Sequence, residues 1–284
     1  MLLIADSGST KCDWVIYKDI NQEPFKIRTK GINPAVLSKK KLKGIIIKNL
    51  ELYKYKDLIT SIYFFGAGCG TKKNQNKIDN ILTSFFKKAK SNTKEDIMAA
   101  VYATTNTPAV VCILGTGSNC CYFDGTNITL KTPALGYIIM DEGSGNHLGK
   151  NLLQSYYYKK MPIELRLKFE KKFNLKEKKV IKKLYHSSTP NKYLAEFSLF
   201  LFENKDNPFI KNLIIDAMDK FIENHILQYS EELKTVPLHF VGSIAYFAKD
   251  YIEIALNKKG LKASSFIRRP IDNLINHIKT EGVA

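Results

Sequence analysis

The segment Asp6–Thr10, with the sequence DSGST, lies between two short apolar runs near the start of the chain. A plain β-hairpin is closed by a two-residue turn such as Asn-Gly. This turn is longer, and each of its residues is small or carries a side-chain oxygen. Backbone N–H groups in such a loop can approach a phosphate, and the Asp6 carboxylate can hold a hydrated Mg²⁺. A polar hairpin turn without a ligand is the alternative interpretation.

A second glycine-rich loop, Gly115-Thr116-Gly117-Ser118, lies between the apolar segments AVVCIL and NCCYF. Glycines at this place matter because a side chain would hold the backbone away from phosphate oxygens. Taken alone, GTGS is an ordinary turn. Its match to the first loop in both flanking pattern and composition favours a shared role in phosphate binding.

Asp96 lies 20 residues before Thr116, at the start of the helix predicted for residues 94–103. A carboxylate can accept the proton of a hydroxyl group whose oxygen attacks a γ-phosphate. The N-terminus of a helix stabilises the ionised form that this role requires. Capping of the helix start by Asp96 or Glu95 is the alternative.

Two further segments combine glycines with polar groups. The segment ALGYIIMDEGSGNHLGK, residues 134–150, places Asp141 and Glu142 side by side among glycines, and carboxylates form strong hydrogen bonds with hydroxyl groups. The segment FVGSIAYFAKDYI, residues 240–252, joins a strand to a helix through Gly242-Ser243, where a nucleotide ring could approach the backbone. An acidic turn that caps the next helix and a tight strand–helix turn are the respective alternatives.

The hydrophobic periodicity predicts an α/β protein. Strands are expected at residues 2–5, 12–17, 24–31, 61–68, 109–125 (strand, turn, strand), 127–132 and 236–242. Helices are expected at residues 39–52, 74–89, 94–103, 243–258 and 271–279, with a mainly helical stretch over 145–234. The repeated strand–glycine turn–strand unit predicts two actin-like ATPase (ribonuclease H-like) lobes with a nucleotide cleft between them. We place the lobes at residues 1–96 and 97–270, with the last helix, 271–284, packing back on the first.

The order of the motifs identifies a resemblance that runs from Leu2 to about His277. The segments DSGSTKCDW, KGINP, YFFGAG, ILGTGSN, MDEGSG and FVGSIA resemble those of the BadF/BadG/BcrA/BcrD-type ATPase family. This family joins N-acetylglucosamine kinases with benzoyl-CoA reductase subunits and hydroxyacyl-CoA dehydratase activators. The chain is most similar to the N-acetylglucosamine kinase-like branch.

The resemblance implies an ATP- and Mg²⁺-dependent kinase that phosphorylates an amino sugar, N-acetylglucosamine or a cell-wall relative, at the 6-hydroxyl. It implies that Thr10 and Thr116 contact the phosphates, that Gly242 lies by the adenosine and that Asp96 is the general base. The full expected nucleotide-binding set is Asp6, Gly8, Ser9, Thr10, Gly115, Thr116, Gly117, Gly242 and Ser243. The expected substrate-binding set is Asn33, Gly136, Asp141 and Glu142, and Asp6 is expected to hold Mg²⁺ through water.

The chain departs from the family pattern at Met140, where the family has glycine before DEGSG, and at Asn273, where PIDNL replaces PIDGL. Ala134-Leu135-Gly136 also stands where the animal kinases often carry Gly-Trp-Gly. These changes leave the identity of the sugar open. Two alternative functions also stay open: an ATPase that activates a radical dehydratase or reductase, and a nucleotide-binding regulator without kinase activity.

The amino-acid composition limits the kinds of binding partner and the cellular location that we expect. The net charge of +17 is spread over helix faces without an arginine-rich tract, which argues against a nucleic-acid partner. The five cysteines have no CxxC spacing and indicate reduced thiols. No apolar run approaches the ~20 residues that span a bilayer, and no signal-peptide core is present. We therefore expect a cytoplasmic protein without a membrane partner, with a homodimer as an open oligomeric state.

Overall fold

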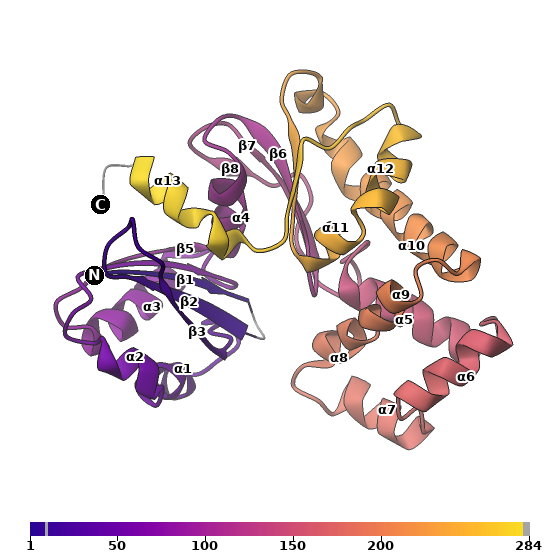
Figure 1. The fold of residues 1–284 in the computed structure, drawn as a ribbon, viewed down its shortest axis with the longest axis horizontal. Coiled ribbons are helices and arrows are strands. Elements are labelled where there is room, and N and C mark those ends of the chain that lie inside the picture. The colour runs from indigo at the N-terminus through magenta and orange to yellow at the C-terminus, as the bar shows by residue number, and fades with distance from the viewer. Residues whose placement is uncertain (9–10, 281–284) are drawn as a thin grey trace. The chain divides into compact units, whose positions relative to one another are not determined.

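The computed structural model describes residues 1–8 and 11–280, and the chain forms two compact units. Unit 1 comprises Met1–Asn106 together with the C-terminal segment from Arg269, and unit 2 comprises Thr107–Arg268 (Figure 1). The boundary therefore falls after Asn106, whereas the sequence placed it after residue 96. The difference arises because the helix that starts at Asp96 packs through Ala99 on the strands of unit 1.

Unit 1 contains a five-stranded sheet in the order β3-β2-β1-β4-β5. Its strands are β1 (Leu2–Ser7), β2 (Lys11–Tyr17), β3 (Phe25–Lys30), β4 (Ser61–Gly66) and β5 (Lys90–Glu95). β1 pairs antiparallel with β2 and parallel with β4, and β5 pairs parallel with β4. Leu3 and Ala5 of β1 enter one hydrophobic cluster and Leu2 and Ile4 enter another, so both faces of this strand are buried.

Helices cover both faces of this sheet (Figure 1). On one face lie α1 (Lys39–Ile47), α2 (Leu50–Lys54) and α3 (Lys72–Phe85), and on the other lie α4 (Asp96–Thr104), the short 3₁₀ helix η4 (Pro270–Asp272) and α13 (Leu274–Thr280). α13 packs through Leu274 and Ile278 against Leu2 and Ile4 of β1. The C-terminal helix thus completes the core of the unit that contains the N-terminus.

β5 is an element that the sequence did not predict, because its residues, KSNTKE, lack an apolar pattern. Its hydroxyl side chains satisfy a neighbouring helix instead: Ser91 and Thr93 both donate to Asp79 of α3, at 2.7 and 2.6 Å. The helix predicted for residues 39–52 is also divided in the structure. Asn49 caps the start of α2 through its side chain and separates it from α1.

Unit 2 repeats the same pairing pattern in a sheet of order β10-β9-β6-β7-β8. Its strands are β6 (Ala109–Leu114), β7 (Ser118–Phe123), β8 (Ile128–Thr129), β9 (Leu238–Val241) and the short β10 (Ser265–Ile267), which the sequence did not predict. β6 pairs antiparallel with β7 and parallel with β9, as β1 does with β2 and β4. The duplicated strand–turn–strand unit expected from the sequence is therefore present.

The helices of unit 2 fill most of the stretch predicted to be helical. They are α5 (Gly145–Tyr157), α6 (Ile163–Lys172), α7 (Glu177–Tyr185), α8 (Pro190–Glu196), α9 (Ser198–Glu203), α10 (Pro208–Phe221), the π-helix η1 (Ile222–Ile226), the 3₁₀ turns η2 (Leu227–Tyr229) and η3 (Glu232–Lys234), α11 (Ser243–Phe247) and α12 (Lys249–Asn257). In the described part of the chain, no helix is both long and apolar enough to cross a membrane. All the cysteines are free thiols and buried.

Candidate functional site

Asp6 lies near the end of β1, where its cross-strand partner on β2 is Asp13. The pKa of Asp6 is raised from its usual 3.8 to about 7, mainly by burial and also by the negative charges of Asp96 and Asp13, which outweigh the lowering by Lys11 and Arg269. Asp13 differs: burial opposes its ionisation, but hydrogen bonds from Arg28 at 2.6 Å and Lys11 at 3.1 Å keep its pKa below the usual value. Of these two carboxyl groups, Asp6 is therefore the one whose negative charge is not compensated by nearby cations.

Asp96 is the first residue of α4, as the sequence predicted. Its pKa is raised from 3.8 to about 6, mainly by burial and also by the charge of Glu95, while the backbone N–H groups of Ile97 and Asp96 partly offset these two effects. Glu95 occupies the N-cap position but makes no side-chain capping bond. Since the charge of Asp96 acts on Asp6, the structure brings together two carboxyl groups that titrate near neutral pH.

Among the predicted residues of the first loop, Ser9 and Thr10 lie outside the described residues, and Gly8 follows the end of β1. The buried Ser7, which the sequence did not single out, fixes the neighbouring segment. Its Oγ accepts a hydrogen bond from the N–H of Ile32 at 2.8 Å and lies 3.2 Å from the Ile32 carbonyl oxygen. This contact holds the chain next to Asn33 against the end of β1.

Asn33 is buried, and its Oδ1 accepts a hydrogen bond from the N–H of Ala35 at 2.9 Å. Gly68, which follows β4, packs directly against this side chain. A Cβ atom at Gly68 would lie 2.2 Å from Asn33 Oδ1, and the φ of Gly68 is +79°. The motifs KGINP and YFFGAG, far apart in the sequence, therefore meet in unit 1 through a contact that requires glycine.

The second loop, Gly115–Gly117, closes the β6–β7 hairpin, and the N–H of Gly115 donates to the carbonyl of Gly117 at 2.9 Å. Its carbonyls are held by the first turn of α5. The N–H groups of Gly145 and Asn146 donate to the carbonyls of Gly115 and Thr116, at 2.8 and 3.0 Å. A Cβ atom at Gly115 would meet nothing within 4 Å, so this loop has open space beside its backbone.

Gly242 joins this loop from the end of β9. Its φ is +118°, and a Cβ atom there would lie 2.3 Å from the carbonyl oxygen of Leu114, immediately before Gly115. Its own N–H donates to the carbonyl of Ile267 on β10 at 2.8 Å, and Ser243 then begins α11. The predicted nucleotide-binding residues Gly115, Thr116, Gly117, Gly242 and Ser243 are therefore brought together within unit 2.

Asp141 attaches the acidic segment to the same loop. Its Oδ1 accepts the N–H of Ser118 at 3.1 Å and its Oδ2 accepts the Asn146 side-chain amide at 2.7 Å. The carboxylate lies over Gly117, where a Cβ atom would be 2.9 Å from Oδ2. Asp141 also has a φ of +72°, which is uncommon for a residue other than glycine and is found at functional sites. Ser118 and Asn146 were not predicted as site residues, although both lie inside the segments that the sequence singled out.

Glu142 points into a different part of unit 2. Its carboxylate lies 3.0 Å from His225 Nε2, and the side-chain amide of Asn224 donates to it at 3.4 Å. Burial opposes the ionisation of Glu142, but the hydrogen bonds from His225 and from the Glu142 backbone N–H, together with the electrostatic effects of His225 and His147, outweigh burial and lower the pKa. His225 is itself buried, lies in the π-helix η1 and stacks on Phe221. Glu142 therefore anchors the DEGSG segment to η1.

Gly136 starts the turn that leads to Asp141. Its φ is +80°, and its carbonyl accepts the N–H groups of Ile139 and Met140, at 3.2 and 2.8 Å. A Cβ atom at Gly136 would meet nothing within 4 Å. The substrate-binding roles of Gly136 and Glu142 stay predictions.

Comparison with known proteins identifies relatives at the level of structure. No protein-family model matches the chain, and no curated protein matches it. A Porphyromonas gingivalis protein named "putative N-acetylglucosamine kinase" is 32% identical over 100% of both chains, with a TM-score of 0.93. A Chromobacterium violaceum protein of the same name is 13% identical over 98% of both chains, with a TM-score of 0.62. A ROK family glucokinase from Streptomyces griseus, in complex with glucose and AMPPNP, is 9% identical over 98% of both chains, with a TM-score of 0.58. The last two likenesses concern the fold alone.

Proposed function

Since the chain belongs to the N-acetylglucosamine kinase-like branch of the BadF/BadG/BcrA/BcrD-type ATPases and is an ATP-dependent sugar kinase with the actin-like ATPase fold, we propose that it phosphorylates the 6-hydroxyl of N-acetylglucosamine or a cell-wall relative. The observation that supports this proposal most is the placement of Asp96 at the first residue of α4 with a pKa of about 6. A general base works best when its pKa lies near the working pH.

In the proposed reaction, Asp96 accepts the proton of the sugar hydroxyl as its oxygen forms a bond to the γ-phosphorus. The bond between that phosphorus and the bridging oxygen breaks, and ADP leaves with the electron pair. The backbone N–H groups at the start of α4 stabilise Asp96 in the ionised form before it accepts the proton. Asp96 therefore both orients the hydroxyl and removes its proton.

Asp6 is proposed to hold Mg²⁺ through water. No group of three or more His, Cys, Asp or Glu side chains in residues 1–8 and 11–280 could hold a metal ion. Mg²⁺ keeps several waters and binds one or two carboxylates together with substrate phosphates, so the carboxylate of Asp6 is the group proposed to hold it. When bound, Mg²⁺ neutralises charge on the phosphate oxygens. The cation would also favour the ionised form of Asp6, whose pKa is otherwise about 7.

The loop Gly115–Gly117 is proposed to present backbone N–H groups to the phosphates, and Gly242 to lie by the adenosine. The support is the open space beside Gly115 and the strict requirement for glycine at residue 242. Thr10 is proposed for the phosphates on the family resemblance. Asn33 and Asp141 are proposed to hydrogen-bond the hydroxyls of the sugar, because both are buried polar side chains held in a fixed orientation.

A coupled assay of ADP release, run over a panel of sugars with ATP and Mg²⁺, tests this proposal. The panel contains N-acetylglucosamine, N-acetylmannosamine, N-acetylmuramic acid, glucosamine, glucose and mannose. We expect the highest kcat/KM with an N-acetylated amino sugar, and a 6-phosphate as the product by NMR. A preference for glucose or mannose would contradict the amino-sugar assignment and leave the kinase reaction intact.

A further inference from the structure

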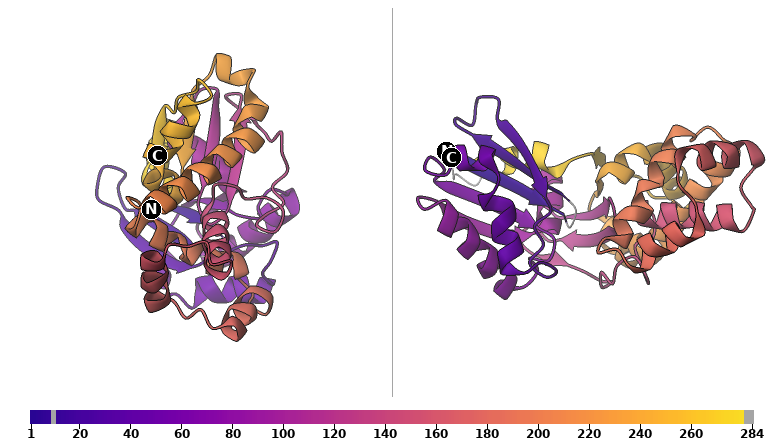
Figure 2. Two further views of the ribbon diagram at one scale, coloured as in Figure 1. Left: turned by 90° about the vertical axis from the view of Figure 1, so that its right-hand side faces the viewer. Right: turned by 90° about the horizontal axis from the view of Figure 1, so that it is seen from below.

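A basic segment of unit 2 plays no part in the proposed reaction. Residues 159–187, here called the basic arm, contain eleven basic and three acidic residues. Their net charge is +8, out of +17 for the whole chain. The basic arm contains α6 and α7, which lie at the end of unit 2 away from its sheet (Figures 1 and 2). Although other helix faces are also basic, close to half of the excess charge is thus concentrated in about a tenth of the chain.

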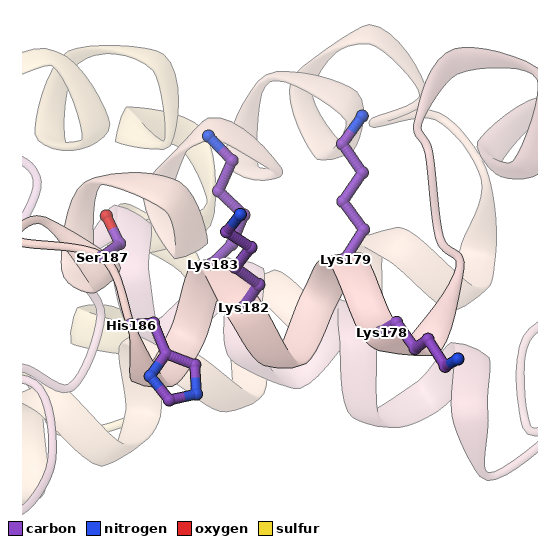
Figure 3. Close-up of a pocket in the computed structure, with 6 residues that line it drawn as sticks. All are labelled: Lys178, Lys179, Lys182, Lys183, His186 and Ser187. Carbon is purple, nitrogen blue, oxygen red and sulfur yellow. The ribbon is translucent and has the colours of Figure 1, made fainter.

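The lysines of α7 are not neutralised by neighbours. Lys178, Lys179, Lys182 and Lys183 line a surface hollow of about 670 Å³ together with His186 and Ser187, and Figure 3 shows Lys179, Lys182 and Lys183 extending to the same side of the helix. None of these four lysines has an ion-pair partner among the described residues. Their i, i+4 spacing brings like charges together, which opposes helix formation and is relieved by an anionic partner.

Apolar side chains are exposed beside these lysines. On α7, Ile181 and Tyr185 lie one turn apart and are 42% and 76% exposed, whereas Val180 is buried. On α6, Ile163 and Leu167 have the same spacing and are 63% and 59% exposed, opposite the buried Leu165 and Phe169. Both helices therefore present an apolar pair to solvent as well as positive charge.

We propose that the basic arm docks on the surface of an anionic lipid bilayer. Lysine ammonium groups gain from the negative potential of such a surface, and exposed apolar side chains gain by shallow insertion among the headgroups. The composition favours lipid over nucleic acid, because all the basic residues of the arm except Arg166 are lysines and the exposed pairs are largely aliphatic. Arginine forks and aromatic stacking, which nucleic-acid recognition uses, are not its main features. This docking needs no membrane-spanning helix, and it departs from the expectation, drawn from the sequence, of a protein without a membrane partner.

Co-sedimentation of the full chain with vesicles tests the proposal. Wild type should bind vesicles of phosphatidylcholine mixed with phosphatidylglycerol and should not bind phosphatidylcholine alone. Replacing Lys178, Lys179, Lys182 and Lys183 by Gln should weaken binding about tenfold or more, since each lysine near an anionic surface contributes to adsorption. Gln has nearly the helix propensity of Lys, so α7 should be retained.

The matched control removes the same charge from unit 1, by replacing Lys39, Lys40, Lys41 and Lys43 of α1 with Gln. This control should bind like wild type, and both variants should keep the wild-type sugar-kinase rate and melting temperature. The pair Ile181→Gln and Tyr185→Gln should abolish the part of the binding that persists at high salt. The proposal is overturned if wild type ignores anionic vesicles, if the control loses as much binding as the α7 variant, or if single-stranded RNA competes the protein off vesicles through the same lysines.

Discussion

The sheets of unit 1 and unit 2 share one pairing pattern, but the ends of their central strands carry different chemistry. In unit 1 the central strand β1 carries Asp6 near its end, Asp96 follows the edge strand β5, and the pKa values of these two carboxyl groups are raised to about 7 and about 6. In unit 2 the ends of the central strands β6 and β9 carry the glycines Gly115 and Gly242. Asp141, beside them, accepts hydrogen bonds through both carboxylate oxygens. The same pairing pattern therefore carries carboxyl groups with raised pKa values in the first unit and close glycine–backbone contacts in the second.

The difference arises from the groups that surround the end of each β-hairpin. In unit 1 the carboxyl groups lie close together, and the available cations, Lys11, Arg28 and Arg269, all contact Asp13. The negative charges of Asp6 and Asp96 are thus less well compensated than that of Asp13. In unit 2 the first turn of α5 supplies N–H donors to the loop carbonyls and an amide to Asp141. The polar groups of unit 2 are satisfied within the fold, whereas those of unit 1 favour a proton, a cation or a substrate hydroxyl.

The largest effect is expected from Asp96→Asn. Asn has nearly the same size but cannot take the hydroxyl proton, so kcat should fall by at least ~10²-fold while ATP still raises the melting temperature. Glu95→Gln is the matched control, since it removes the adjacent carboxylate and should keep most of the wild-type turnover. Steady-state kinetics and melting curves on both variants check this. Near wild-type turnover in Asp96→Asn would show that the base has been misassigned.

Substitution of the two glycines in unit 2 should separate folding from nucleotide binding. Gly242→Ala places a Cβ atom 2.3 Å from the Leu114 carbonyl at a φ of +118° and should lower the stability by about 2 kcal/mol. Gly115→Ala meets nothing within 4 Å and should leave the melting temperature unchanged. It should nevertheless weaken the binding of a non-hydrolysable ATP analogue by calorimetry. Unchanged affinity in Gly115→Ala would argue against backbone contact with the phosphates.

Replacement of Asp6 and of Asp13 by the neutral Asn should change the free energy of unfolding in opposite directions. The pKa of Asp6 is higher in the folded protein than its usual value, so its contribution to stability falls as pH rises from 3.8 to about 7. The pKa of Asp13 is lowered, so its contribution is present above its usual pKa and is lost as pH falls through the lower value. At pH 8, Asp6→Asn should therefore stabilise the fold and Asp13→Asn should destabilise it.

Urea unfolding at pH 8 and at pH 4 measures these two effects. The gain from Asp6→Asn should shrink towards pH 4, where the wild-type carboxyl is protonated in the folded protein. Saturating Mg²⁺–ATP should reverse the gain, because the proposed cation favours the ionised form of Asp6. Destabilisation by both variants at pH 8 would refute the electrostatic contrast between them.

The sequence predicted the features whose residues are adjacent in the chain. The loop Gly115–Gly117 and the helix start at Asp96 could be predicted because turn chemistry and helix termini depend on a few neighbouring residues. β5 could not, because the polar residues of this edge strand are stabilised by α3 rather than by an apolar pattern. The divided helix at Asn49 was missed because the apolar spacing continues across the break while the side-chain cap interrupts it.

Contacts between distant residues were beyond the reach of the sequence. The pair Glu142–His225 spans 83 residues and depends on the π-helix η1, a local irregularity that periodicity does not reveal. Likewise, the packing of Gly68 on Asn33 depends on how β4 and the segment after β3 are brought together by the sheet. The sequence identified Asp141 and Glu142 as one pair, whereas the structure gives them different partners.

The smallest effects are expected from that acidic pair, and they test whether Asp141 belongs to the site and Glu142 to the framework. Asp141→Asn replaces one acceptor oxygen by an amide, so it should raise the KM for the sugar severalfold with a smaller change in kcat.

Glu142→Gln keeps a hydrogen-bonding group beside His225 and should leave both kcat and the KM for the sugar near wild type. Its cost should appear as a stability loss of ~1 kcal/mol, because the pair is largely buried but Gln keeps an oxygen that can accept a hydrogen bond beside His225. Since the pKa of Glu142 is lowered, this loss should be present at neutral pH and vanish as pH falls through that value. Kinetics and urea unfolding on the two variants measure both quantities. If Glu142→Gln raises the KM for the sugar as much as Asp141→Asn does, Glu142 contacts the substrate and the division between the two carboxylates is wrong.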